Sequence, residues 1–514
     1  MSEKFIDFKS TPATHGVPST HGMECFRNFL KIYQFKEPTT KTPGNCENGA
    51  SSAATALREC VDRVDWMRDP ERMSVDGFDV QFETGDYVAI FMDSVGLLGT
   101  KVTWLAIEST LQKFMGTESR FGVNKTITNI GDNKGFTSRI GLVEPDWTPP
   151  SDKLPKKFVV KIMHGEEMAK LSGGDASEND AAMKRKIVER AVRIIGNHEI
   201  DVYDILKREN PEGFLYPKMY GYKKFTKAEE DSFFILEFFE NVTSVAMYEN
   251  VSVENVRQVM TAMAPFMTLS EKVPVRKEVY FWDTWKALMK NNYFKAAGAD
   301  KSHPELVDKV LPLINKVYLN GTIMLNLMIL PFFLLKVKPV LVHNDLWSAN
   351  IIWTKEEDSE MKMRAVIDFA GTFVGNPAMD LSKLIITGLS PADRRANTDK
   401  LLEEYYETYA KALDGKAAPF SLEQLKELYR TLVPMSVVFL STMIISFFEI
   451  IPAEVIAEHR TAALEKLVAA FEDLLIVHEE LVVKYPKIYN TGKGQLLTYT
   501  APKLIYVLLR HVIF

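Results

Sequence analysis

The stretch LVHNDLWSANIIW, residues 341–353, places a histidine, two asparagines and an aspartate in a segment that is otherwise apolar enough to be buried. Burying a polar side chain is costly unless something partners it, so His343, Asp345 and Asn350 need a structural or a chemical role. The β-rich piece AVIDFAG follows and places Asp368 18 residues after Asn350. Since VLVHND at the start of the motif is also β-rich, the pattern predicts these polar side chains on loops just after short strands.

The spacing His-x-Asp-x-x-x-x-Asn, followed by Ile-Asp-Phe, supplies oxygen-bearing side chains to neighbouring loops. The oxygens of Asn350 and Asp368 suit Mg²⁺, and Asp345 is a spare carboxylate that can take a proton from a hydroxyl. Buried turns closed by Asx caps are the structural alternative. We favour the chemical interpretation because further parts of the same machinery precede the motif in the chain.

A glycine-bearing turn, NIGDNKGFTSR, occupies residues 129–139 between two strand-like segments. Gly131 and Gly135 permit a tight turn whose backbone N–H groups can approach phosphates, and Ser138 adds a hydroxyl donor. Taken alone, two glycines between strands are more typical of an ordinary hairpin.

Lys161 stands among apolar residues in the strand-like segment FVVKI, residues 158–162. Such a lysine either extends its ammonium to solvent at a sheet edge or meets a carboxylate or phosphate. Glu199 offers a carboxylate from a long helix that we expect from Asn179 to about Leu206, interrupted near Gly196. Glycine turn, strand lysine, helix glutamate, HxDxxxxN and IDF follow the order of parts in kinase-like phosphoryl transfer.

The composition is that of a folded protein, with 514 residues, 46% hydrophobic and 25% charged. The net charge is -6 and no long basic run is present, so nucleic acid is not an expected partner. The three cysteines, Cys25, Cys46 and Cys60, lie in the first sixty residues without metal-ligand spacing, as a reducing compartment permits. The N-terminus lacks the pattern of a secretory signal, and we expect a cytoplasmic protein.

Two apolar runs, residues 322–335 and 435–448, are each 14 residues long. A membrane-spanning helix needs roughly 20 residues, so the runs predict buried core helices and no transmembrane segment. The apolar tail, residues 504–514, contains Arg510 and predicts a docking strand or helix. A weak contact of this tail with a membrane surface is the less favoured alternative.

The texture of the sequence predicts an α+β protein of three parts. Residues 1–83 form an N-terminal extension, partly disordered by composition. Residues 84–240 read as a β-rich N-lobe in the order strand, turn, strand, strand, helix, strand. Residues 241–514 read as a larger, mainly helical C-lobe that carries the opening motif.

These motifs resemble those of the choline/ecdysteroid-kinase-like (CHK) group of small-molecule kinases, nematode-type branch, which is related to the aminoglycoside phosphotransferases. The resemblance is carried by LLGTKVTW, FGVNKTITNIGDNKGFTSRIGLVEPDW, KPVLVHNDLWSANIIW and AVIDFAGTFVGNPAMDL, and it covers about residues 95–480. It implies a bilobal protein-kinase-like fold, with ATP and Mg²⁺ as cofactors and a small-molecule alcohol as substrate.

Roles in the C-lobe follow from the resemblance position by position. Asp345 would be the catalytic base, and Asn350 and Asp368 would be the Mg²⁺ ligands. His343 and Asp380 would brace the catalytic loop. The sequence departs from the group at Asn344, where glycine is common, and at Phe369-Ala370, where Trp-Gln is common.

Roles in the N-lobe also follow from the resemblance. Lys161, positioned by Glu199, would hold the α- and β-phosphates. The turn of residues 129–139, with Gly131, Gly135 and Ser138, would cover them. The end of the last N-lobe strand would present backbone groups to adenine, at Glu237, Phe238 and Phe239.

Two functional hypotheses follow. The first is an ATP-dependent phosphotransferase that moves the γ-phosphoryl group to a hydroxyl of a small, sterol- or choline-like molecule. The second is a catalytically silent nucleotide-binding scaffold with the same fold. A protein kinase is disfavoured because only 11 residues separate Asp368 from Asp380, which leaves no room for a long activation segment.

Overall fold

The structure is a computed structural model that describes residues 74–75, 78–79, 96–131, 137–165, 178–272, 304–318, 321–354, 360–450 and 453–489. The chain divides into two compact units, Met1–Val95 and Gly96–Phe514. In the first unit, β1 (Ser74–Val75) pairs antiparallel with β2 (Phe78–Asp79). The extension proposed for residues 1–83 lies almost wholly outside the described residues, and its boundary at residue 83 stays a prediction. Both predicted lobes fall largely in the second unit.

The N-lobe is built on a five-stranded antiparallel sheet in the order β4-β5-β7-β9-β8. Its strands are β4 (Thr126–Asn129), β5 (Ser138–Glu144), β7 (Phe158–Met163), β8 (Met219–Lys223) and β9 (Phe233–Glu237). The strands predicted around residues 125–163 and 231–241 are thus present. A short pair, β3 (Arg120–Phe121) with β6 (Trp147–Thr148), stands beside this sheet, and η2 (Leu97–Gly99) precedes it.

The two faces of the sheet pack against different helices, because side chains alternate along a strand. Phe158, Val160 and Ile162 of β7 belong to a core that includes Ile107 and Leu111 of α4 (Trp104–Met115). The remaining face of β7 meets α6 (Glu178–Glu209), where Met163 packs with Val188, Val192 and Ile195. Lys161 is on this second face, so strand alternation directs it toward α6.

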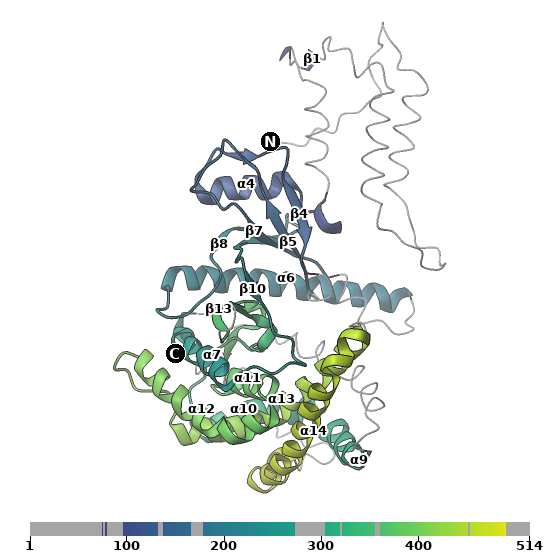
Figure 1. Ribbon diagram of the computed structural model, residues 1–514, viewed down its shortest axis with the longest axis vertical. Coiled ribbons are helices and arrows are strands. Elements are labelled where there is room, and N and C mark those ends of the chain that lie inside the picture. Colours follow the sequence, from purple (N-terminus) through teal and green to yellow (C-terminus); the bar gives the residue numbers. More distant parts are fainter. Residues whose placement is uncertain are drawn as a thin grey trace. The chain divides into compact units, whose positions relative to one another are not determined.

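Helix α6 is continuous, and the interruption predicted near Gly196 is wrong. Glycine is present for packing, since a Cβ added at Gly196 would lie 2.7 Å from Cγ of Met163. A larger residue at this position would have to displace the Met163 side chain or the helix. Glycine thus allows α6 to pack closely against β7 at Met163. Figure 1 shows α6 running between the sheet of the N-lobe and the C-lobe.

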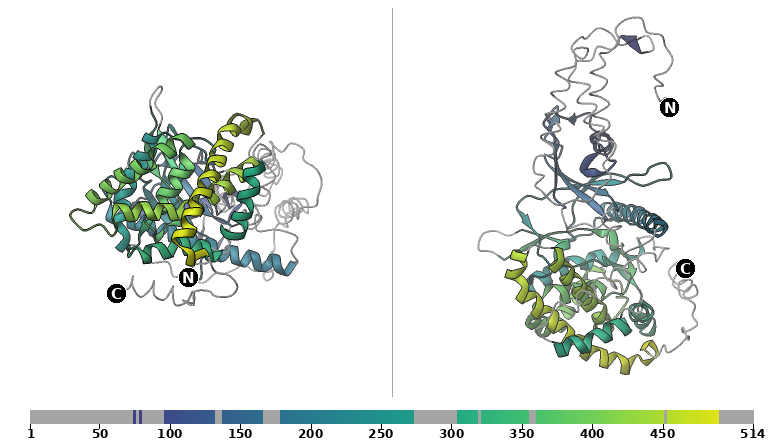
Figure 2. Two further views of the ribbon diagram at one scale, coloured as in Figure 1. Left: turned by 90° about the horizontal axis from the view of Figure 1, so that it is seen from below. Right: turned by 90° about the vertical axis from the view of Figure 1, so that its right-hand side faces the viewer.

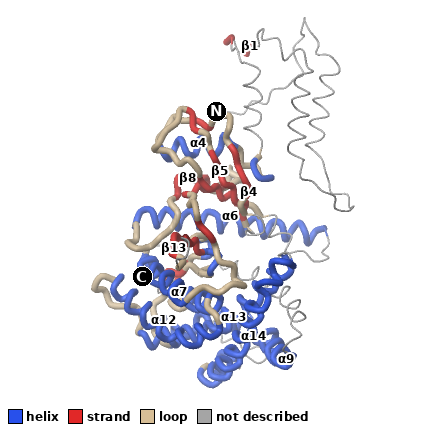
Figure 3. Tube along the Cα trace, viewed as in Figure 1, coloured by secondary structure: helices blue, strands red, loops and turns tan. Residues whose placement is uncertain are grey.

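The C-lobe is mainly helical, as predicted (Figures 2 and 3). Its helices are α7 (Val253–Met267), α9 (Pro304–Leu313), α10 (Gly321–Leu334), α11 (Met379–Gly388), α12 (Pro391–Ala412), α13 (Leu422–Ile450), α14 (Ala453–Lys484) and α15 (Pro486–Tyr489), with short turns η3 (Thr268–Glu271) and η4 (Ile314–Tyr318). Every residue of α11 is buried, so this helix is the centre of the lobe. The α+β fold with a β-rich lobe and a larger helical lobe is confirmed.

Short strands in the C-lobe carry the loops of the opening motif. One pair joins β11 (Val340–Val342) and β14 (Phe373–Gly375). A second sheet joins β10 (Val242–Thr243), β12 (Ile351–Thr354) and β13 (Lys362–Val366). Between these strands lie η5 (Ser348–Asn350) and η6 (Phe369–Gly371). His343, Asp345 and Asp368 therefore stand just after short strands, as their pattern predicts, whereas Asn350 ends η5 directly before β12.

The two apolar runs are core helices rather than membrane spans. Residues 322–335 fall mostly in α10, where Met324 and Leu327 are buried, and residues 435–448 fall in α13, where Val437 and Leu440 are buried. Among the helices that the structure describes, none is long and apolar enough to cross a membrane. The tail of residues 504–514 lies outside the described residues.

Lys466 of α14 is fully buried and ties three segments of the C-lobe together. Its ammonium donates to the carbonyls of Met247, Glu249 and Thr387 at 3.1, 2.5 and 2.8 Å. Thr387 is in the last turn of α11, where carbonyls lack partners within the helix. Burial lowers the pKa of Lys466 to about 7. The three acceptors offset part of the cost of burying this charge.

We expect Lys466→Met to lower the free energy of unfolding by about 1–3 kcal/mol, because methionine fills the space but leaves buried carbonyls without a donor. Denaturant unfolding of the two proteins measures the change. Lys426→Met is the matched control, since Lys426 forms a half-exposed ion pair with Glu403 at 2.7 Å and such pairs contribute little. Equal stability of wild type and Lys466→Met would contradict the structural role.

Candidate active site

The structure brings Lys161 of β7 and Glu199 of α6 into direct contact. The lysine ammonium lies 2.9 and 2.8 Å from the two carboxylate oxygens of Glu199. It also lies 3.0 Å from Oδ1 of Asp368, which follows β13 in the C-lobe. The side chains of Lys161 and Glu199 are 8% and 1% exposed, whereas that of Asp368 is 39% exposed. The buried Lys161–Glu199 pair of the N-lobe thus contacts the C-lobe through Asp368, whose carboxylate solvent can reach.

The charges of this trio shift one another's titration. Burial raises the pKa of Glu199 to about 7, against the opposing effect of Lys161. Burial alone would lower the pKa of Lys161, but the carboxylates of Asp368 and Glu199 outweigh it and raise that pKa above the ordinary value. The lysine likewise holds the pKa of Asp368 below its ordinary value, although the partial burial of this carboxylate opposes the shift. Asp368 is therefore ionised at neutral pH and available to a cation.

The loop that carries Asp345 is held in place by α11. The backbone N–H groups of His343 and Asn344 each donate to a carboxylate oxygen of Asp380 at 2.7 Å. The ring of His343 is bonded to the carbonyl of Ile367 at 3.0 Å through Nε2 and accepts from the N–H of Asp345 at 3.2 Å through Nδ1. The bracing contacts expected of His343 and Asp380 are present in the structure.

Asn344 explains the departure from glycine noted in the sequence. Its φ is +65°, in the left-handed region that glycine adopts freely and asparagine tolerates better than most residues. Asp368 also has a positive φ of 66°. Asn344 and Asp368 thus both adopt a left-handed backbone conformation, and Asp368 does so in contact with the buried Lys161.

Asp345 and Asn350 are joined by hydrogen bonds within the same loop. The side-chain N–H group of Asn350 donates to the backbone carbonyl of Asp345 at 2.8 Å and to its Oδ2 at 2.9 Å. The nitrogen end of the amide is thereby used, and the oxygen end is the one suited to a cation. The side chain of Asp345 is 38% exposed, so a ligand can reach it.

The oxygen donors of Asn350 and Asp368 fit Mg²⁺ better than a transition metal. Among the described residues, no three His, Cys, Asp or Glu side chains gather as metal ligands. Magnesium commonly uses only one or two protein ligands and takes the rest from water and substrate phosphates. The donor set therefore fits a cation shared with a nucleotide.

Further predicted residues of the N-lobe belong to the glycine-bearing turn of residues 129–139. Ser138 is buried in β5, opposite Met163 of β7. Gly131 follows β4, and a Cβ there would lie 2.9 Å from the side chain of Ile140, so packing already requires this glycine. Gly135 lies outside the described residues. The phosphate contacts of this turn stay a prediction.

The residues expected to face adenine, Glu237, Phe238 and Phe239, lie at the last residue of β9 and just after it. Oε2 of Glu237 accepts from the N–H of Lys218 at 3.2 Å, and the Phe239 ring is buried with the guanidinium of Arg364 4.3 Å from its centre. These side chains have structural partners of their own. A contact of this segment with adenine would use the backbone and stays a prediction.

Helix α6 is fastened to the turn between β8 and β9, a feature that sequence reasoning missed. The amide of Asn197 both donates to and accepts from the backbone of Phe225, each at 2.9 Å. The guanidinium of Arg193 lies 4.8 Å from the centre of the Phe225 ring and donates to the carbonyl of Thr226 at 2.5 Å. These contacts fix the helix two and six residues before Glu199.

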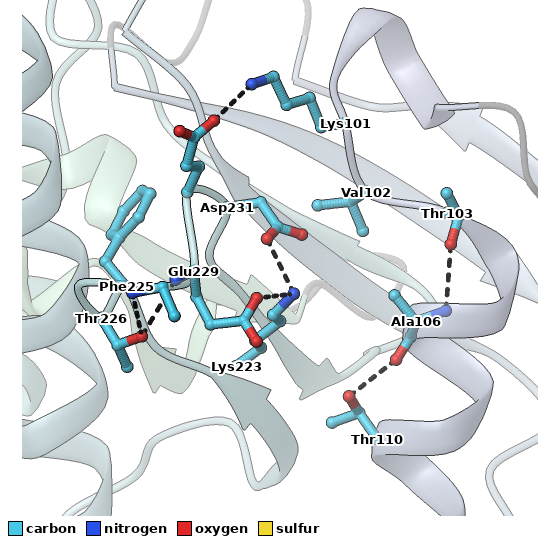
Figure 4. A network of polar contacts seen from close by, with 12 residues as sticks. Lys101, Val102, Thr103, Ala106, Thr110, Lys223, Phe225, Thr226, Glu229 and Asp231 are labelled. Carbon is cyan, nitrogen blue, oxygen red and sulfur yellow. Dashed lines mark hydrogen bonds and ion pairs between the residues drawn. The ribbon is translucent and has the colours of Figure 1, made fainter. Parts of the chain in front are cut away.

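The turn itself is well connected (Figure 4). The Thr226 hydroxyl oxygen accepts from the N–H groups of Ala228 and Glu229 at 3.2 and 3.1 Å. Lys223 pairs with Glu229 and Asp231 at 2.6 and 2.8 Å. A stiff turn is a firm support for α6.

His198 joins α6 to the C-lobe from the opposite side. Its Nε2 lies 2.6 Å from the carbonyl oxygen of Thr372, just beyond η6. Glu199 is therefore flanked by Asn197, which contacts the N-lobe turn, and by His198, which contacts the loop after Asp368. The run Asn-His-Glu in the middle of a helix was the available sequence signal.

For the ATP-dependent transfer that the sequence resemblance implies, Asn197→Ala should reduce kcat/KM for ATP about tenfold, because losing this reciprocal pair, worth roughly 1–3 kcal/mol, frees α6 to move Glu199. Initial rates at varied ATP measure this. Asn397→Ala is a matched control, since Asn397 makes a similar 2.9 Å bond to Asp393 on α12. An Asn197→Ala protein with unchanged kinetics would contradict this role.

Comparison with known proteins finds one curated relative at a confident level. A 92-residue segment is 39% identical to "Uncharacterized kinase-like protein D1044.1" of Caenorhabditis elegans, and it covers 18% of this chain and 23% of that protein. The chain thus matches less than a quarter of that relative's length.

Similar solved structures include a choline kinase from Cryptosporidium parvum Iowa II, with a TM-score of 0.40 and 16% identity over 72% of this chain and 93% of that one. A Plasmodium vivax ethanolamine kinase gives a TM-score of 0.35 and 14% identity over 77% of this chain and 96% of that one. In addition, residues 90–482 match the sequence profile of the DUF1679 family, which is described as "Uncharacterized oxidoreductase dhs-27". The match covers most of the chain, which therefore belongs to the DUF1679 family.

Proposed function

We propose that this protein is a phosphotransferase that uses ATP and Mg²⁺ to phosphorylate a hydroxyl group of a small molecule. One observation carries the proposal: the ammonium of Lys161 contacts both Glu199 and Asp368, 38 and 207 residues away in the chain. A lysine held between a helix glutamate and a metal-binding aspartate is the arrangement that kinase-like folds use to orient nucleotide phosphates.

The chain's own residues divide the work in this proposal. Lys161 holds the α- and β-phosphates, and Glu199 keeps its ammonium in position. Asn350 and Asp368 hold Mg²⁺, which neutralises the charge of the phosphates when bound. Asp345 orients the acceptor hydroxyl and takes its proton as the phosphoryl group is transferred.

A small acceptor is favoured over a protein. Between Asp368 and Asp380 the chain forms only η6, β14 and the start of α11. These elements leave no segment long enough to dock a peptide. A sterol- or choline-like alcohol is the class we propose.

The description of the family as an oxidoreductase does not change this proposal. Doubly wound oxidoreductases bind dinucleotides at the carboxyl edge of a parallel sheet. Strands β4, β5, β7, β8 and β9 all pair antiparallel. The described N-lobe sheet thus differs from the sheet of a doubly wound dinucleotide-binding fold.

The test is transfer of label from γ-labelled ATP to a metabolite extract. Purified full-length protein with Mg²⁺ should produce a labelled small molecule, and chelation of Mg²⁺ should abolish the product because the metal offsets phosphate charge. Binding of MgATP, seen as a thermal shift, without any transfer to a broad set of alcohols would favour the silent scaffold. If the protein neither binds MgATP nor transfers the label, both proposed functions are overturned.

A further inference from the structure

Lys383 is a second buried lysine at the site, and neither the motif nor the proposed mechanism assigns it a role. It lies on α11, three residues after Asp380, so the two side chains project from the same face of the helix. Asp380 accepts from the N–H groups of His343 and Asn344, while the Lys383 ammonium donates to the carbonyl of Asn344. Helix α11 therefore binds two N–H donors and one carbonyl acceptor of the loop that carries Asp345.

The ammonium of Lys383 also lies beside the proposed base. Nζ is 3.7 Å from Oδ1 of Asp345 and 4.4 Å from the centre of the Phe439 ring. The side chain of Lys383 is only 6% exposed, and burial lowers its pKa, although Asp345 and Asp380 oppose that shift. The carboxylate of Asp345 thus already has a cationic partner supplied by the protein.

This arrangement bears on the acceptor. A hydroxyl that transfers its proton to Asp345 must lie within hydrogen-bond reach of that carboxylate, and hence a few ångströms from Lys383. An ammonium group attached near the hydroxyl would meet a like charge there. The aromatic ring near this position, that of Phe439, already contacts the Lys383 ammonium. It also packs edge-on against Trp347, with 6.3 Å between the ring centres.

We propose that Lys383 is a specificity-determining residue that makes the site select alcohols without a positive charge near the reacting hydroxyl. The inference rests on the proposed phosphotransferase function and separates its two candidate classes, since a sterol-like alcohol is uncharged and a choline-like alcohol is cationic. Like charges placed close together are a common means of rejecting the wrong ligand.

The first test identifies the charge of the natural acceptors. Labelled products from the metabolite extract are isolated and treated with phosphatase, which removes the labelled phosphate. The released alcohols are then followed by mass spectrometry as they pass over a cation exchanger at pH 7. We expect them not to be retained. Retention of the main acceptor would overturn the role of Lys383 but leave the phosphotransferase intact. Absence of any labelled product would overturn the phosphotransferase function and this inference with it.

The second test uses two alcohols of nearly the same shape, choline and its uncharged analogue 3,3-dimethylbutan-1-ol, as competitors of labelled-product formation. For wild type we expect the uncharged alcohol to compete at about tenfold lower concentration, which corresponds to roughly 1.4 kcal/mol. Lys383→Met should narrow the difference, while Lys383→Arg and the remote control Lys426→Met should keep it.

Equal or better competition by choline in wild type would overturn the proposal, as would failure of the uncharged alcohol to compete. An unchanged preference in folded Lys383→Met would overturn it as well. If Lys383→Met does not fold, the wild-type preference and Lys383→Gln decide the matter.

Discussion

Asp345→Asn should reduce phosphoryl transfer by about 10²–10⁴-fold, the usual contribution of a general base, while the protein still binds MgATP. Asparagine has nearly the volume of aspartate, so the loop keeps its shape. It cannot take a proton from the acceptor. The contacts of Lys161 with Glu199 and Asp368 do not involve Asp345. The side-chain oxygen of the new asparagine can still accept from the amide of Asn350, so we expect the nucleotide site to remain intact.

Two measurements check this expectation: initial rates of labelled-product formation, and the thermal shift that MgATP produces. Asp414→Asn is a suitable control, because Asp414 has a φ of +49° that asparagine also tolerates and it lies in the loop after α12. Equal labelling by wild type and Asp345→Asn would sink the assignment of Asp345 as the base. Loss of the MgATP shift together with the rate would point to a collapsed loop instead.

The sequence predicted well the placement of those site residues that depends only on local patterns along the chain. Strand alternation placed Lys161 on one face of β7, and a strand-loop pattern placed Asp345 and Asp368 after short strands. Each of these conclusions needs only neighbouring residues. The order of the parts along the chain then supplied the expectation that they meet.

What the sequence could not predict depends on contacts between distant segments. Nothing near Lys383 distinguishes it from a lysine at a helix surface, and only the packing of α11 brings it to Asp345. The interruption of α6 was predicted because glycine weakens a helix, but its close approach to Met163 explains the residue. Strand β8 was missed because MYGYK shows little alternation of apolar and polar residues.

Lys161→Met should abolish most transfer and also destabilise the protein, by about 3–5 kcal/mol, because it removes one partner of a buried ion pair. Glu199 is 1% exposed and would keep its carboxylate without the ammonium. In wild type, burial already raises the pKa of Glu199 to about 7 although Lys161 opposes the shift. Without the lysine that pKa must rise further.

The destabilisation of Lys161→Met should therefore depend on pH. A group with a raised pKa in the folded state stabilises the protein at low pH and loses that contribution as pH rises through the folded pKa. Denaturant unfolding should thus show a larger deficit at pH 8 than at pH 6. Lys426→Met should show a small deficit at both values, since its ion pair is half-exposed.

A double variant separates the lost charge from the lost packing. Lys161→Met with Glu199→Gln removes both charges, so it should be more stable than Lys161→Met alone, and its pH dependence should weaken. It should nevertheless remain inactive, because the phosphates of the nucleotide lose their cation. If adding Glu199→Gln leaves the stability of Lys161→Met unchanged at pH 8, the buried carboxylate is not the source of the cost. In that case the contact of Lys161 with Asp368 at 3.0 Å would have to supply it.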